Sequence, residues 1–171
     1  MTAYDPQRQR LLSFFDAVPA FLAGRDSPSA YLERCLATIG EREPAVQAFV
    51  VLNEAGARKA AAAADERYRE GRPLSPIDGM PIGVKDLYET HDMPTQMGSP
   101  LFKGWQSSRD GAPVRALRLS GAVILGKTVT TEFGFYHPGP TRNPFDPART
   151  PGGSSRSSFW PAARTSSSEI R

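Results

Sequence analysis

The sequence predicts an α/β domain in which a mostly parallel sheet is flanked by helices. Three observations lead to this prediction. Apolar residues recur at helical spacing after Ser27, an alanine-rich helical pattern covers residues 54–70, and short apolar strands cover residues 80–85 and 122–128. A helical pattern over residues 112–119 runs through a glycine turn directly into the second strand, which is typical of an α/β layer.

Length and charge narrow the class of protein. The 171 residues suit one domain or one large fragment, and 39% hydrophobic content is enough to build a core. The chain carries 21 basic and 18 acidic residues, but residues 151–171 hold three arginines and one glutamate, which leaves 18 against 17 in the first 150 residues. This near balance argues against a nucleic-acid-binding face. A single cysteine, Cys35, a polar N-terminus and the absence of a long apolar run predict a cytoplasmic protein without a membrane partner.

The N-terminal part of the chain predicts two helices. The apolar segment over residues 11–22 predicts a short helix that is interrupted near Pro19, because proline removes a donor and clashes with the preceding turn. Ser27-Pro28 predicts the start of the second helix, with a hydroxyl N-cap and a proline in the first position. We expect this helix to end near Gly40 or before Pro44.

The rest of the chain alternates strands, helices and loops. Residues 46–52 favour a strand by their β-branched content, and residues 54–70 favour a helix that ends at Gly71. Residues 95–111 are rich in Gly, Ser and Pro and predict an ordered loop. From His137 onward, closely spaced prolines predict that regular structure stops.

Lys85 is the first candidate for chemistry. It stands near the end of a short apolar strand in Asp78-Gly79-Met80-Pro81-Ile82-Gly83-Val84-Lys85-Asp86. Burial disfavours a charged amine and can lower the pKa of a lysine by several units, which would make it a base. If the strand alternates, Gly83 lies on the same face and leaves space for another backbone to approach. The spacing alone leaves open a solvated lysine that pairs with Asp86 or Glu89.

Gly152-Gly153-Ser154-Ser155 is the second candidate. Small residues let the backbone adopt an unusual conformation and aim a hydroxyl inward, and a flexible linker is the alternative. A phosphate-binding loop is not supported, because no Gly-Lys-Ser/Thr follows. The two histidines, His91 and His137, and one cysteine argue against a zinc site, and neither histidine has the sequence context of a Ser-His-Asp triad. We therefore expect no metal and no cofactor.

Four motifs occur in a fixed order along the chain. They are residues 78–86, Met93-Pro94-Thr95 leading to Gly98-Ser99, Gly121 to Thr128 followed by Thr131-Glu132-Phe133, and Gly139 to Asn143-Pro144 running to Ser155. In this combination the chain resembles the amidase signature family of serine amidohydrolases, which includes general amidases and the A subunit of aminoacyl-tRNA amidotransferases. The resemblance implies that residues 27–155 are the N-terminal part of an α/β fold with a mixed sheet flanked by helices. Residues 1–26 would form an N-terminal arm.

The resemblance also implies a Ser-cisSer-Lys triad that hydrolyses a carboxylic amide to an acid and ammonia or an amine. Lys85 matches the family lysine, a general base that is neutral at rest. Ser154 matches the bridging serine, which a cis peptide bond holds in place. Ser155, Gly152 and Gly153 would be structural residues of the site.

The chain departs from the family pattern after Ser155. The family's nucleophilic serine lies in a second Gly- and Ser-rich motif, roughly two dozen residues beyond the bridging serine. Only 17 of the 171 residues follow Ser154, and the serines of Ser166-Ser167-Ser168 lack the glycines that would expose a nucleophile. We therefore expect no nucleophile within the chain, a divergent and disordered tail over residues 156–171, and no activity of the chain alone.

Several functional alternatives remain at this point. The chain would bind a small amide substrate if another segment completed the site. The alternatives are a non-catalytic interaction fragment, a subunit-like piece, and a remnant of the A subunit of an aminoacyl-tRNA amidotransferase. A shift of reading frame or a premature stop after the Ser155 codon would explain the abrupt end of the match.

Overall fold

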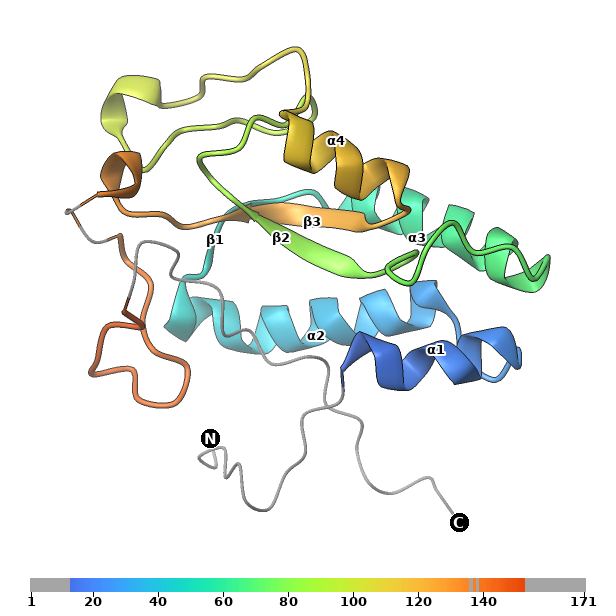
Figure 1. The fold of residues 1–171 in the computed structure, drawn as a ribbon. Helices are drawn as coiled ribbons and strands as arrows, with labels where there is room; N and C mark the ends of the chain where they lie inside the picture. The colour runs from blue at the N-terminus through green and yellow to red at the C-terminus, as the bar shows by residue number, and fades with distance from the viewer. Residues whose placement is uncertain (1–12, 136, 138, 153–171) are drawn as a thin grey trace.

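The computed structural model describes residues 13–135, 137 and 139–152, and these residues build a small mixed sheet with helices on both faces (Figure 1). The helices are α1 (Phe14–Leu22), α2 (Pro28–Val46), α3 (Glu54–Arg69) and α4 (Ala112–Leu119), and the strands are β1 (Phe49–Leu52), β2 (Pro81–Lys85) and β3 (Val123–Thr128). Single 3-10 turns cover Pro100–Phe102 and Glu132–Gly134. The α/β prediction is confirmed.

The sheet has the order β1-β3-β2, with the fully buried β3 in the centre. β3 runs parallel to β2, where Lys85 pairs with Thr128, and antiparallel to β1, where Phe49 pairs with the same threonine. The sheet is therefore mixed rather than mostly parallel. The mixed sheet that the family resemblance implied is thereby confirmed.

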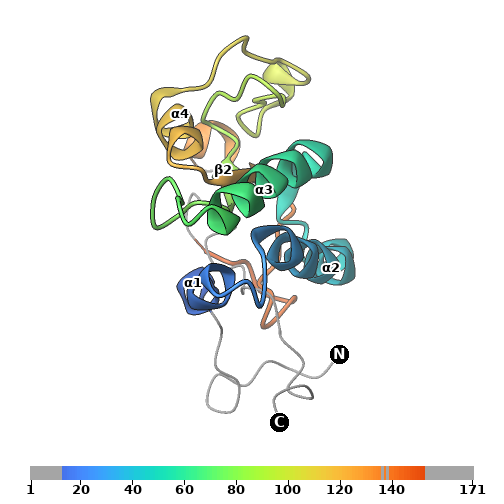
Figure 2. The same ribbon diagram turned by 90° about the vertical axis from the view of Figure 1, so that its right-hand side faces the viewer.

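The two faces of β3 contact different helices, as the alternation of a strand requires. Val123 and Leu125 pack with α2 and α3, whereas Ile124 packs with Val84 and with Val114 of α4. Figure 2 shows α4 on one side of the sheet and α2 and α3 on the other. These layers confirm the strand predicted over residues 122–128 and the helix predicted over residues 112–119.

Helix α1 is continuous, so the predicted interruption near Pro19 is wrong. Proline removes one backbone donor, but the capping box of Ser13 and Asp16 supports the first turn. Aromatic packing supports the rest. The Phe14 ring lies 5.4 Å from the Tyr31 ring, and the Phe21 ring 5.5 Å from the Tyr68 ring. Helix α1 therefore packs on α2 and α3, and these contacts outweigh the backbone hydrogen bond that Pro19 cannot donate.

Helix α2 begins as predicted and ends later than predicted. The Ser27 hydroxyl accepts a bond of 3.1 Å from Ala30 N–H. The helix then continues through Gly40 and Pro44 to Val46, which is 5% exposed, and stops at Gln47 in the left-handed region. Burial of the last turn offsets the weak helix formers. Consequently β1 starts at Phe49 and is shorter than the predicted strand.

A buried carboxylate fixes the chain before β2. Asp78 is fully buried and accepts two bonds from the Arg67 guanidinium, at 2.8 and 2.6 Å, and one of 2.8 Å from Leu74 N–H. Gly121 lies so close that a Cβ there would stand 2.2 Å from an oxygen of Asp78. Gly79 N–H bonds to the carbonyl of Gly121 at 2.9 Å. The acidic and glycine residues of this motif thus align β2 with β3.

Within the described residues, no helix combines the length and apolar character that crossing a membrane requires. The predicted helix over residues 54–70 is confirmed, with Gly71 at a φ of +67° after its end. The loop predicted over residues 95–111 is confirmed apart from its one 3-10 turn. The predicted tail over residues 156–171 lies outside the described part of the chain.

We predict that the purified chain self-associates as its concentration rises. Among the described residues β2 has no partner on its outer edge, and an apolar groove runs beside it. Phe15, which is 55% exposed and lines this groove, is the residue to change. Phe15→Lys should lower association in sedimentation velocity, whereas Leu119→Lys, on an exposed position of α4 outside the groove, should not. A chain that is monomeric at every concentration would contradict this prediction.

Candidate active site

Lys85 is the last residue of β2 and lies at the carboxyl end of the parallel β2–β3 pair. Ligands of open α/β sheets bind at this end of the strands. Its side chain is half-buried. Its Nζ lies 3.9 Å from the point where a Cβ would stand at Gly134, a residue with a φ of +76°. Lys85 stands at the end of an apolar strand, as predicted. Among the described residues, however, its side chain is only half-buried and not fully buried.

The strand leaves room beside Lys85 through Gly83. A Cβ at Gly83 would lie 2.6 Å from the Thr128 methyl group and 3.4 Å from the Phe49 ring. The space therefore admits two side chains of the neighbouring strands rather than the backbone that the sequence suggested. Gly83 brings β2, β3 and β1 close together directly before the lysine.

An open groove of about 660 Å³ runs along β2 and includes Lys85. Most of its wall is apolar and comes from α1, α2 and α4 as well as from the strand itself. Tyr31, Met80 and Leu117 are among the lining residues. A largely apolar wall that includes one lysine suits an uncharged organic group better than a polyanion.

Asp86 does not pair with Lys85, as one alternative had it, but with Lys127 on β3. The Lys127 Nζ lies 2.9 Å from Asp86 Oδ1, and both side chains are 0% exposed. Lys127 also donates to the Thr95 hydroxyl at 2.7 Å and to the carbonyl of Pro94 at 3.1 Å. Lys127 is thus the fully buried lysine of this region, and sequence reasoning missed it because it stands inside a near-continuous apolar strand.

Burial works against both charges of this pair. Desolvation raises the pKa of Asp86, and the bonds from Lys127 and from the backbone N–H groups of Gln96 and Met97 act in the opposite direction. Desolvation likewise lowers the pKa of Lys127, and Asp86 partly offsets this change. The pair stays ionised only as a unit, because each charge supplies the field that the other lost on leaving water.

The second candidate motif lies mostly outside the described residues. Gly152 is the last residue described; it is exposed and has a φ of +75°, and no atom lies within 4 Å of a Cβ placed there. Its backbone conformation alone therefore favours glycine. Gly153, Ser154, Ser155 and the cis peptide bond predicted at Ser154 fall outside the described part, so their roles stay predictions.

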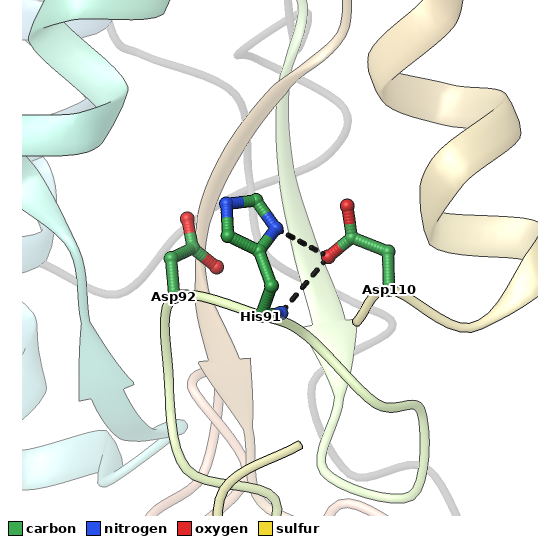
Figure 3. A group of neighbouring side chains, drawn as sticks. All are labelled: His91, Asp92 and Asp110. Atoms are coloured by element: carbon green, nitrogen blue, oxygen red, sulfur yellow. Dashed lines mark hydrogen bonds and ion pairs between the residues drawn. The ribbon is translucent and has the colours of Figure 1, made fainter. Parts of the chain in front are cut away.

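A cluster of His91, Asp92 and Asp110 lies in the loops that follow β2 and precede α4 (Figure 3). His91 contacts one oxygen of Asp110 through both its backbone N–H (3.0 Å) and its Nδ1 (2.9 Å). The Arg118 guanidinium lies 2.7 Å from Asp92 and 3.1 Å from Asp110, and the Asn53 amide donates to Asp92 at 2.9 Å. Both carboxylates are thus already neutralised by a guanidinium, and the cluster joins these loops to α3 and α4.

Because of this cluster, we expect the free energy of unfolding to fall at acidic pH. Burial alone would raise the pKa of Asp110, but the bonds from His91 and the nearby Arg118 hold it below its ordinary value. The contribution of Asp110 is therefore complete above about pH 4, the ordinary range of an aspartate, and is lost as the pH falls through the lower folded-state pKa. Asp110→Asn should flatten the acid limb of a urea-denaturation series. An unchanged pH dependence would contradict this explanation.

The buried ion pair of Asp86 and Lys127 leads to a prediction about the free energy of unfolding of its variants. Lys127→Met leaves the Asp86 carboxylate buried without its cation, and we expect it to lower the free energy of unfolding by about 3–5 kcal/mol. Asp86→Asn should also be destabilising. The double variant should lose clearly less than the two single losses together, because neither charge is left alone. Urea denaturation of the four chains measures this coupling, and strictly additive losses would show that the pair is not coupled.

Comparisons of the sequence with known proteins identify the family of the chain. A model of the amidase family matches residues 30–156. The chain is 41% identical over 143 residues to the A subunit of the glutamyl-tRNA(Gln) amidotransferase from Acidothermus cellulolyticus. It is 40% identical over 146 residues to the corresponding protein from Chloroflexus aurantiacus. These alignments cover 80% and 81% of this chain, but only 28% and 30% of the relatives.

A solved structure gives the same result for the fold. The native peptide amidase from Stenotrophomonas maltophilia superposes with a TM-score of 0.71 at 34% identity, over 84% of this chain and 32% of that one. The chain therefore spans about a third of the length of the proteins it matches. The family match covers most of the described residues, including Lys85, Asp86 and Lys127. The chain belongs to the amidase family.

Proposed function

We propose that the chain is the lysine-bearing part of an amidase that hydrolyses carboxylic amides. One observation carries this proposal: Lys85 lies at the carboxyl end of the parallel strand pair, beside an apolar groove, within the segment that matches the family. The proposed domain covers residues 27–155, with residues 1–26 as an arm and residues 156–171 as a divergent tail. A small amide substrate and a cytoplasmic location belong to the same proposal.

The proposed chemistry is a serine–lysine route to an acyl-enzyme. Lys85 acts as the general base, and the hydroxyl of Ser154 relays a proton between the lysine and a nucleophilic serine. That nucleophile attacks the amide carbonyl, ammonia or an amine leaves, and water then releases the acid. Backbone N–H groups beside the nucleophile would stabilise the oxyanion. Ser155, Gly152 and Gly153 shape the loop that carries Ser154.

The half-buried position of Lys85 supports the role of base. The amine lies 3.9 Å from a Cβ placed at Gly134, and the neighbouring Asp86 is occupied by Lys127. The role of nucleophile is not assigned to any residue of this chain.

We predict negligible amide hydrolysis by the purified 171-residue chain, because the proposed route needs a nucleophilic serine and none of these residues is assigned that role. The test is ammonia release from a panel of simple carboxylic amides. Lys85→Ala is the diagnostic variant, and Lys59→Ala, at an exposed position of α3, is its control. Turnover by the unchanged chain that Lys85→Ala abolishes and Lys59→Ala retains would overturn the prediction.

A second candidate is a role as one component of a glutamyl-tRNA(Gln) amidotransferase. The relatives from Acidothermus cellulolyticus and Chloroflexus aurantiacus, which are named as components of that enzyme, favour it. In this case the chain would act through protein partners rather than alone. Co-purification with a second polypeptide that carries the Gly- and Ser-rich nucleophile motif would favour this role, and recovery of the chain alone from its native cell would favour the first.

A further inference from the structure

Two residues in the loops that follow β2 and β3 have an uncommon backbone conformation. Met97 has a φ of +56° and Phe133 a φ of +48°, although neither is a glycine. Left-handed backbone at a bulky residue persists only where the surrounding structure fixes it, and such residues cluster at functional sites. The two are in direct contact, because Phe133 N–H donates to the carbonyl of Met97 at 2.8 Å.

The buried pair of Asp86 and Lys127 fixes the first of these residues. Gln96 N–H donates to Asp86 Oδ2 at 3.1 Å, and Met97 N–H donates to the carbonyl of Asp86 at 3.0 Å. Lys127 holds the two residues before them, through the carbonyl of Pro94 and the Thr95 hydroxyl. Every residue of the segment 94–97 is therefore bonded to one member of the pair.

The fixed segment in turn sets the wall beside the Lys85 amine. Phe133 is bonded to Met97, and a Cβ placed at the next residue, Gly134, would stand 3.9 Å from the lysine Nζ. In Figure 1 the 3-10 turn that contains Phe133 lies next to the turn at residues 100–102, and the Phe102 and Phe133 rings are 6.0 Å apart. The bonds thus lead from the pair, through Met97 and Phe133, to Gly134 beside the Lys85 amine.

We propose that the ion pair of Asp86 and Lys127 is a positioning pair for Lys85: it holds the strained backbone at Met97 and, through it, at Phe133, and these two residues fix the wall beside the lysine amine. The catalytic meaning of this positioning rests on the proposed function. The geometric claim does not, because it concerns the environment of one amine.

Core packing alone does not account for the two charges. An apolar pair of similar volume is often as stable as a buried ion pair, or more so. What an apolar pair cannot supply is the set of bonds that holds Pro94, Thr95 and Gln96. The pair is therefore suited to fixing one backbone path rather than to adding stability.

The reactivity of Lys85 tests the proposal without any turnover. The full chain is treated with a limiting amount of acetic anhydride, and peptide mass spectrometry gives the acetylation of Lys85 relative to Lys59, an exposed lysine of α3 in the same sample. Lys127→Met should raise this ratio by about tenfold, the change that accompanies a loss of roughly 1.4 kcal/mol of local protection. Lys127→Arg, which keeps the cation, should stay close to the unchanged chain.

Leu32→Ala separates positioning from general loss of stability. Leu32 is fully buried in the core of α2, α3 and β3, and it belongs to a different core cluster from the residues around the pair. Its variant should lose stability and leave the ratio unchanged. An unchanged ratio in folded Lys127→Met, or an equal rise in Leu32→Ala, would overturn the proposal.

Thr95→Val provides the same test if Lys127→Met does not fold. It removes one partner of Lys127 and keeps the ion pair, so a smaller rise in the ratio supports the proposal and no rise overturns it. Since the readout needs no nucleophile, failure of the proposed amidase function would leave these outcomes unaffected.

Discussion

A buried ion pair between Asp86 and Lys127 is the constraint on which the site depends. Both side chains are 0% exposed, so each lost its hydration when the chain folded. The loss is offset by their mutual attraction and by bonds to the loop after β2. Since redirecting that loop would leave a charge buried without its partners, the pair favours a single arrangement of the backbone around Lys85.

The two ends of β2 show how this constraint is built. Asp78 aligns the start of β2 with Gly121 before β3, and Asp86 joins the end of β2 to Lys127 on β3. Two acidic residues, one at each end of the motif 78–86, thus fix the parallel pair. The motif looks like a catalytic signature in the sequence, yet both of its acidic residues are engaged in packing, Asp78 with Arg67 and Asp86 with Lys127.

The fold was largely predictable from the sequence, and the site only in part. Helical spacing, N-caps and apolar strands located most elements, and their errors at Pro19 and Pro44 arose where tertiary packing outweighed a local breaker. The position of Lys85 was also predictable. Its neighbourhood was not, because the burial of Lys127 and the left-handed backbone at Met97 depend on contacts between segments far apart in the chain.

The central claim is that Lys85 stands in the base position of an amidase site. A chimera tests it most directly: residues 13–152 replace the matching segment of the Stenotrophomonas maltophilia peptide amidase, which supplies the rest of the fold. Peptide-amide hydrolysis by the folded chimera is then measured with Lys85→Met and with Lys103→Met, an exposed position. We predict that the first substitution abolishes hydrolysis and the second leaves it intact. Equal hydrolysis by the Lys85→Met chimera and its parent would contradict the account.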